Sequence, residues 1–227
     1  MDISLFSGQG LEFIYRFIHF LSGVCWIGVL WYFNFIQGSY FAEADGGAKS
    51  DAVKKLVPRA LWWFRWGAMG TFLSGCLLLM AKSMSAGMGI FNTSWGLTIL
   101  VGSLMGTFMW FNVWFIIWPA QKVVIAAANG EDQPTAAACA AKAGLASRTN
   151  TLFSIPLLFF MGAASHLPVS IGARGTMTAM LVAFAVIILV ELNGLFGKLG
   201  PIKKVSGVIH MGLLLTALLF AIVEGFS

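Results

Sequence analysis

The sequence predicts an all-α integral membrane protein, built as a bundle of about six transmembrane helices. Two observations support this fold class. Of the 227 residues, 59% are hydrophobic and only 10% are charged, a composition typical of membrane proteins. The apolar residues also gather in runs long enough to cross roughly 30 Å of hydrocarbon as helices. We therefore expect one transmembrane domain over residues 1–227.

The expected membrane spans lie near residues 12–38, 60–81, 95–118, 151–168, 176–197 and 204–224. The first apolar run lacks a basic start and is too long for a signal peptide, so we expect it to stay as a spanning helix. The connection 42–58 is polar and ends at Pro58, just before the second span. The connection 119–150 begins at Pro119 and becomes rich in alanine, which predicts a short cytoplasmic or interfacial helix.

Lysine and arginine residues are concentrated in alternate connections. Ten of them lie in 42–59, 119–150 and 198–204, whereas the connections on the other side hold only Lys82 and Arg174. The positive-inside rule then places both termini outside, which is the periplasm for a multi-pass protein of the bacterial inner membrane. Because the basic residues are divided among short loops, the net charge of +5 does not indicate binding to nucleic acid.

The first span contains an unusual group of residues, Arg16, His19, Gly23 and Trp26. Helical spacing places His19, Gly23 and Trp26 on one face, with Arg16 one turn earlier. A ring nitrogen, a small notch and a flat ring on one stripe would suit haem b, with iron on His19 and a propionate near Arg16. The alternative is a polar patch that contacts a neighbouring helix. Ionisable residues at membrane depth are costly and usually functional, which favours the cofactor site.

His166 lies near the outer end of the fourth span, at a depth similar to that of His19 in the first span. We therefore predict that one haem b has His19 and His166 as the axial ligands of its iron. Gly162, four residues before His166, would clear space on that face, and Arg174 would be a second cation for the propionates. Two imidazole ligands would leave no open coordination position, which suits electron transfer.

His210 enters from the inner side, so roughly ten residues of helix separate its level from that of the other two histidines. Pairing of His19 or His166 with His210 is one alternative, and an iron with a single protein ligand is another. His210 could also belong to a second site with Arg65 and Glu191, or could hydrogen-bond between helices. The chain shows no pattern typical of a nucleophilic hydrolase, a phosphate-binding loop or a carboxylate metal cluster.

Four stretches of the chain share one resemblance. They are His19-Phe-Leu-Ser-Gly-Val-Cys-Trp26-Ile-Gly28 with Trp31-Tyr-Phe33, Trp63-Phe-Arg65-Trp66 with Leu73-Ser-Gly75, Phe111-Asn-Val-Trp-Phe-Ile-Ile-Trp118-Pro119-Ala-Gln-Lys122, and Arg148-Thr-Asn-Thr-Leu-Phe-Ser-Ile-Pro156 through Phe160 to His166. These stretches resemble the membrane domain of the cytochrome-c-linked bacterial urate oxidases. The resemblance implies an arrangement in which a cytochrome c domain follows the membrane domain and lies in the periplasm. Residues 1–227 contain no C-x-x-C-H motif for covalent haem. The resemblance is therefore to the N-terminal domain without the cytochrome. It implies a helical bundle, haem ligands and a redox role that needs a separate electron partner.

These observations leave three functional hypotheses. The first is a haem-b redox protein that passes electrons at the periplasmic face to or from a cytochrome c, a quinol or a partner subunit. The second is a membrane urate oxidase that oxidises a urate-type substrate and gives the electrons to cytochrome c. The third is a non-redox accessory subunit. In each case we expect the chain to lie in the lipid bilayer and to work inside a larger membrane complex.

Overall fold

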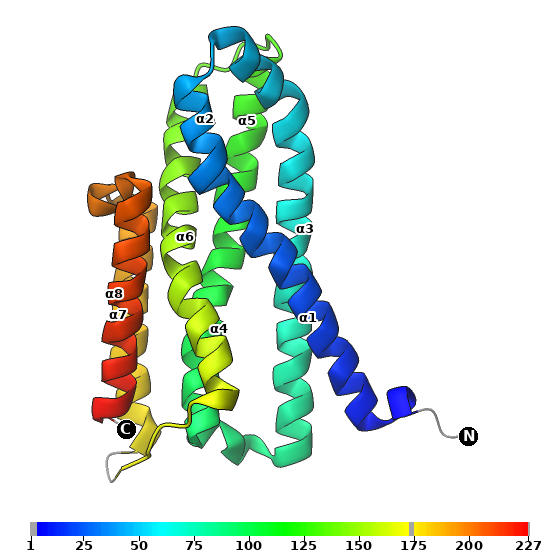
Figure 1. The fold of residues 1–227 in the computed structure, drawn as a ribbon, viewed down its shortest axis with the longest axis vertical. Helices are drawn as coiled ribbons and strands as arrows, with labels where there is room; N and C mark the ends of the chain where they lie inside the picture. Colours follow the sequence, from blue (N-terminus) through cyan, green and yellow to red (C-terminus); the bar gives the residue numbers. More distant parts are fainter. Residues whose placement is uncertain (1–3, 173–174, 227) are drawn as a thin grey trace.

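The computed structural model describes residues 4–172 and 175–226, and every regular element within them is helical. The long helices follow the long axis of the molecule, with α1 tilted across them (Figure 1). The helices are α1 (Gly8–Trp31), η2 (Tyr32–Gln37), α2 (Gly38–Glu43), α3 (Gly46–Ala86), α4 (Ser94–Phe111), η4 (Asn112–Ile117), α5 (Trp118–Ala128), α6 (Ala136–His166), α7 (Gly175–Phe196) and α8 (Val205–Phe226), with short 3-10 segments η1 (Ser4–Phe6), η3 (Met88–Asn92) and η5 (Gly200–Lys203). The predicted all-α fold is confirmed for these residues.

Five helical stretches of the described chain are long and apolar enough to cross a membrane, namely Gly8–Glu43, Gly46–Ala86, Ser94–Ala128, Gly175–Phe196 and Val205–Phe226. The last two match the predicted spans 176–197 and 204–224 to within two residues. Helix α6 is not among the five. Its middle carries polar residues such as Thr149, Asn150 and Ser154, and all three are buried inside the protein.

The prediction of a polar connection that ends before the second helix was wrong. Helix α3 begins at Gly46 and continues through Pro58. Asp45 caps the N-terminus of α3, because its carboxylate accepts a hydrogen bond of 2.9 Å from the backbone N–H of Ala48. The helix therefore begins before the predicted second span. Proline removes one backbone hydrogen bond but does not end this helix, whose neighbouring turns are held by packing and by local pairs such as Asp51–Lys55.

The prediction of a separate interfacial helix within residues 119–150 was also wrong. Pro119 lies in the first turn of α5, where proline is tolerated. The chain then reverses near Gly130, whose φ of 94° is a backbone conformation that favours glycine. The alanine-rich stretch forms the beginning of α6, because alanine has the highest helix propensity and small side chains such as Ala143 and Ala146 pack closely, each 1% exposed.

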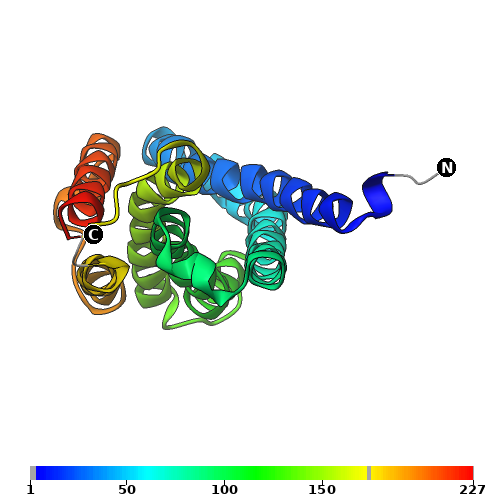
Figure 2. The ribbon, with the colours of Figure 1, turned by 90° about the horizontal axis from the view of Figure 1, so that it is seen from below.

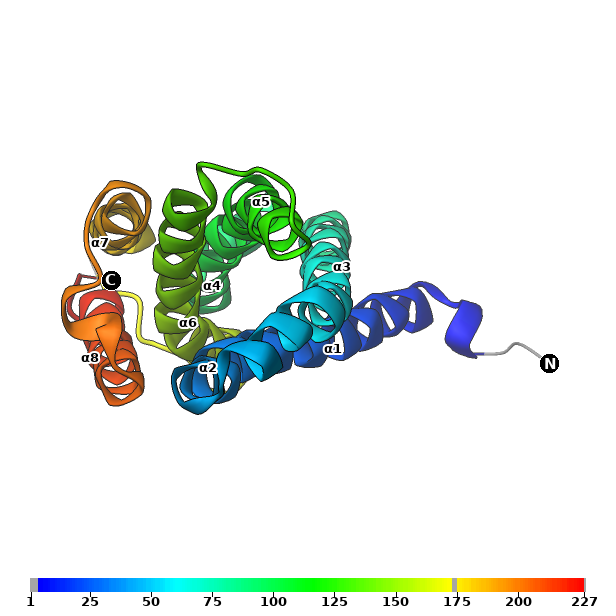
Figure 3. The same ribbon diagram turned by 90° about the horizontal axis from the view of Figure 1, so that it is seen from above.

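Seen along the long axis, α1, α3, α4 with α5, and α6 form a ring (Figures 2 and 3). Helices α7 and α8 lie outside this ring, against each other and against α4 and α6. Helix α1 begins and α8 ends at the same end of the bundle, which we name the lower end (Figure 1). The α2–α3 and α5–α6 connections lie at the opposite, upper end. Two of the three basic connections predicted to face the cytoplasm therefore lie together at the upper end, and the α7–α8 connection lies below them in Figure 1.

A long-range hydrogen bond ties α1 to α6. Nε1 of Trp31 lies 2.8 Å from Oγ of Ser154, whose side chain is fully buried. We expect Trp31→Phe to lower the free energy of unfolding by about 1 kcal/mol, because it removes this bond and little apolar area. Titration with SDS in mixed micelles measures the change. Trp63→Phe is the matched control, since Trp63 is 58% exposed, and an equal loss in both variants would contradict the prediction.

Candidate functional site

His19 lies on the face of α1 that contacts α3. Its Nδ1 is 3.2 Å from Oγ of Ser74, and its ring lies against Gly75, where an added Cβ would be 3.2 Å from Cε1 of His19. The Ser74 hydroxyl is 2.5 Å from the carbonyl oxygen of Gly70 and 3.1 Å from that of Thr71. Because its one hydrogen is donated to a carbonyl, Ser74 accepts a hydrogen bond from Nδ1–H of His19. Nε2 then keeps the lone pair that could bind a metal.

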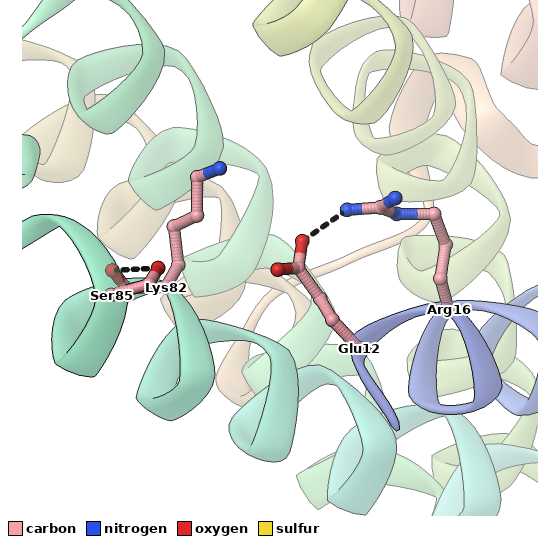
Figure 4. A network of polar contacts seen from close by, with 4 residues as sticks. All are labelled: Glu12, Arg16, Lys82 and Ser85. Atoms are coloured by element: carbon pink, nitrogen blue, oxygen red, sulfur yellow. Dashed lines mark hydrogen bonds and ion pairs between the residues drawn. The ribbon is translucent and has the colours of Figure 1, made fainter. Parts of the chain in front are cut away.

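The other residues predicted on this face have different surroundings. The guanidinium of Arg16 forms an ion pair of 2.6 Å with Glu12, and half of its side chain is exposed (Figure 4). An added Cβ on Gly23 would lie 3.9 Å from Thr71, which is ordinary contact, so α3 fills the predicted notch. Trp26 is 1% exposed, and its Nε1 has no hydrogen-bond partner among the described residues.

Figure 4 also shows Lys82 of α3 near the Glu12–Arg16 pair. Its Nζ lies 5.9 Å from the centre of the Trp95 ring. Neither ion pair found within the described part of the chain includes Lys82. Lys82, which entered the sequence argument only through orientation, is therefore a second cation at the lower end, and it forms no ion pair within the described residues.

His166 is the last residue of α6 and is exposed at the lower end. Gly162, one turn earlier, is also exposed, and an added Cβ would meet nothing within 4 Å. Arg174 lies outside the described residues. The lower half of α1 leans away from α6 (Figures 1 and 2). No contact between His166 and His19 is found among the described residues, and the ring of His19 contacts α3.

The three residues of the predicted second site also have separate surroundings. His210 is exposed on α8. The guanidinium of Arg65 on α3 lies over the ring of Trp118, 3.9 Å from its centre, and 5.5 Å from the ring centre of Trp114. Such contacts between a cation and aromatic faces stabilise a charge away from water. Glu191 on α7 belongs to a different network.

This buried network joins η4, α6 and α7. Nδ2 of Asn112 lies 2.9 Å from Oδ1 of Asn150 and 3.1 Å from Oε2 of Glu191. Nδ2 of Asn150 donates to the carbonyl oxygen of Met109 at 2.9 Å. The two asparagines are completely buried and Glu191 is 3% exposed. Oδ1 of Asn112 and Oε1 of Glu191 have no hydrogen-bond partner among the described residues.

Sequence reasoning selected Glu191 but missed Asn112 and Asn150. The signal that could have found them is an amide within or beside an apolar run, because such groups usually hydrogen-bond between membrane helices. Asn112 also begins η4, one of two π-helical segments within residues 4–172 and 175–226, and the other segment, η2, contains the buried Asn34. π-helical turns recur at functional sites, because the extra residue per turn redirects side chains.

The model of the urate oxidase N-terminal family matches residues 84–222. No curated protein and no solved structure matches the chain. The matched residues run from the end of α3 almost to the end of α8, and they include the Asn112 network, His166 and His210. His19 and its contacts with α3 lie before the matched residues. Because the match covers more than half of the chain, this protein belongs to the urate oxidase N-terminal family, as its resemblance to that family predicted.

Proposed function

We propose that the chain is a membrane redox module that holds haem b on His19 and takes part in the oxidation of urate or a related small molecule. Membership of the urate oxidase N-terminal family supports this class of substrate. The single structural observation that supports the haem is the contact of His19 Nδ1 with Ser74 Oγ, which assigns the iron to the other ring nitrogen, Nε2. Electrons would leave at the lower end to a periplasmic cytochrome c, a quinol or a partner subunit of a larger complex.

The proposed topology has six crossings and places both ends of the chain in the periplasm. Helix α6 would be the sixth crossing, since its 31 residues run beside α4 and α5. Its buried polar residues face neighbouring helices and need no contact with lipid. The lysine- and arginine-rich upper end would then face the cytoplasm, as the positive-inside rule requires for a protein of the bacterial inner membrane.

His19 fits the role of a haem ligand. Histidines that bind metals usually donate their other ring N–H to a fixed acceptor, which Ser74 provides here. Within residues 4–172 and 175–226, no group of three or more His, Cys, Asp or Glu could hold a metal ion. Haem needs only axial ligands from the protein, because its porphyrin supplies four nitrogens, and it would supply one-electron chemistry. Because the ring of His19 contacts Ser74 on α3, we propose one protein ligand and keep the predicted pair with His166 as the alternative.

Three functions remain to be separated by measurement. Reduction of a bound haem by urate would identify an oxidase that acts on urate itself. A haem reduced only by a cytochrome c or a quinol would identify an electron carrier. A folded protein without haem would leave the non-redox accessory subunit.

We expect the purified protein to show a b-type reduced-minus-oxidised spectrum that His19→Ala abolishes, because the iron loses its ligand. Phe20→Ala is the matched control on the same helix, since Phe20 is 65% exposed, and its spectrum should equal that of the wild type. His166→Ala tests the paired site, and retention of the haem in this variant supports a single protein ligand. Haem retained at full occupancy in His19→Ala, or absent from the folded wild type, would refute the haem assignment.

A further inference from the structure

A cavity of about 370 Å³ lies near the upper end of the bundle. Residues of η2, α3, η4, α5, α6 and the connection between α7 and α8 line it. Figure 3 looks down from this end onto the ring that α2, α3, α5 and α6 form. The volume lies within the range of sites for small organic ligands, which is about 300–1,000 Å³. The cavity is therefore large enough for a ligand of one or two small rings.

Positive charge in the cavity is not balanced by the protein. Arg148 and Lys203 line it, and no Asp or Glu of the described residues does. Nη1 of Arg148 is buried and has no hydrogen-bond partner in the described part of the chain. Neither ion pair found there involves Arg148 or Lys203. Because a buried guanidinium nitrogen without a hydrogen-bond partner is costly, an anion in the cavity would be stabilised by charge-assisted hydrogen bonds.

Side-chain amides and aromatic rings complete the lining. Asn34 already donates from Nδ2 to a backbone carbonyl and to a serine hydroxyl, so its free group is the oxygen, an acceptor. Oε1 of Gln37 is a second acceptor, buried and without a partner among the described residues. Phe33 and Phe64 supply flat apolar surface, with ring centres 5.6 Å apart and an angle of 89°. The lining thus offers two cations, two acceptors and aromatic walls.

We infer that this cavity binds a small planar organic anion that carries both N–H and carbonyl groups. Arg148 pairs with its negative charge, the oxygens of Asn34 and Gln37 accept its N–H groups, and the ring of Phe33, which Phe64 supports edge to face, packs against its plane. Oxidised purines belong to this class. The choice of urate as the probe rests on the proposed function, whereas binding itself requires no haem.

The position of the cavity also assigns a direction to the proposed reaction. The cavity lies near the upper end, while His19 lies in the part of α1 that leads to the lower end. The basic upper end attracts anions toward the cavity through its positive potential. The substrate would therefore enter from the cytoplasmic side, and the electrons would leave on the periplasmic side.

Equilibrium dialysis of radiolabelled urate against the full chain in detergent tests the inference. We expect saturable binding that Arg148→Gln weakens at least about tenfold, as the loss of a charge-assisted contact predicts. Lys142→Gln is the matched control, because Lys142 is an exposed cation near the start of the same helix and does not line the cavity. Its affinity for urate should equal that of the wild type.

A second variant tests the cavity independently, so that the test remains valid if Arg148→Gln does not fold. Gly144 lines the cavity, and an added Cβ there would meet nothing within 4 Å. Gly144→Leu should therefore occupy the cavity without displacing the helix and should abolish urate binding. Gly28→Leu adds the same side chain at an exposed position of α1, where an added Cβ also meets nothing, and it should bind as the wild type does.

The outcomes separate this inference from the proposed function. No saturable binding of urate to the folded wild type, or equal affinity in Arg148→Gln and Lys142→Gln, would overturn the inference. Inorganic phosphate that competes as well as urate would refute recognition of a planar ligand. If the protein holds no haem but binds urate in a manner that depends on Arg148, the result supports the binding site in the cavity and refutes the proposed redox function. If the protein oxidises urate and neither Arg148→Gln nor Gly144→Leu changes the rate, the result supports the proposed redox function and refutes the binding site in the cavity.

Discussion

Asn112→Ala is expected to lower the free energy of unfolding by about 2–4 kcal/mol, because it leaves buried polar groups without partners. Asn112 alone joins Asn150 to Glu191, through contacts of 2.9 and 3.1 Å from one nitrogen. Its removal leaves Oε2 of Glu191 without a donor among the described residues and opens a small void between η4, α6 and α7. Unfolding by SDS in mixed micelles, followed by tryptophan fluorescence, measures the loss.

Asn193→Ala is the matched control for this variant. Asn193 lies on α7 close to Glu191, but its amide is exposed and makes only one long contact of 3.3 Å. We expect its effect to stay below about 0.5 kcal/mol. A double-mutant cycle with Glu191→Ala isolates the coupling between the two side chains. Additive effects of Asn112→Ala and Glu191→Ala would show that the network does not stabilise the bundle as a unit.

Gly67→Leu is expected to have the second large effect, a loss of about 2–4 kcal/mol in the free energy of unfolding. An added Cβ at Gly67 would lie 3.0 Å from the backbone N of Trp26 and 3.2 Å from the backbone O of Ser22. Because both contacts are to backbone atoms, no side chain can turn aside, and α1 must move away from α3. The contact between His19 and Ser74 depends on the same pair of helices. Haem retention should fall together with stability.

The control is Gly28→Leu, which adds leucine to α1 at an exposed position with no atom within 4 Å of the added Cβ. Its stability in the same SDS titration should lie within about 0.5 kcal/mol of the wild type. Equal stability of Gly67→Leu and Gly28→Leu would mean that α1 and α3 do not pack as closely as the structure shows. The haem spectrum of Gly67→Leu also shows whether haem binding by His19 needs the contact with Ser74 on α3. Loss of the haem signal means that it does, and an unchanged signal means that it does not.

The two π-helical segments connect these features. Segment η4 presents Asn112 to α6 and α7 on one side and Trp114 to Arg65 of α3 on the other. Segment η2 places Asn34 and Gln37 at the cavity near Arg148. A regular α-helix repeats each face every 3.6 residues, and one π-helical turn shifts that register. The polar interior of this bundle is therefore arranged around two local departures from α-helical geometry.

The sequence by itself determined the fold class, the family and the ends of the last two spans. Apolar composition and run length are local properties, and they limit a chain in lipid to helices whose backbone bonds are satisfied internally. The same local reasoning failed at Pro58 and Pro119, because proline near a helix start or in a well-packed helix does not always end it. It paired His19 with His166 of the fourth span, whereas the contact that the structure shows for the His19 ring is with Ser74 on α3.

Only the tertiary structure decided which polar groups meet. Asn112 and Glu191 are 79 positions apart in the chain, and Asn112 and Asn150 are 38 apart. No periodicity within one helix encodes such a contact, since it depends on the rotation and tilt of helices packed against one another. For the same reason the tilt of α1, which sets His19 against Ser74 and apart from His166, could not be predicted from depth alone. The depth of a residue in the membrane follows from counting residues along its helix. The neighbouring helix that its side chain faces depends instead on how the helices pack.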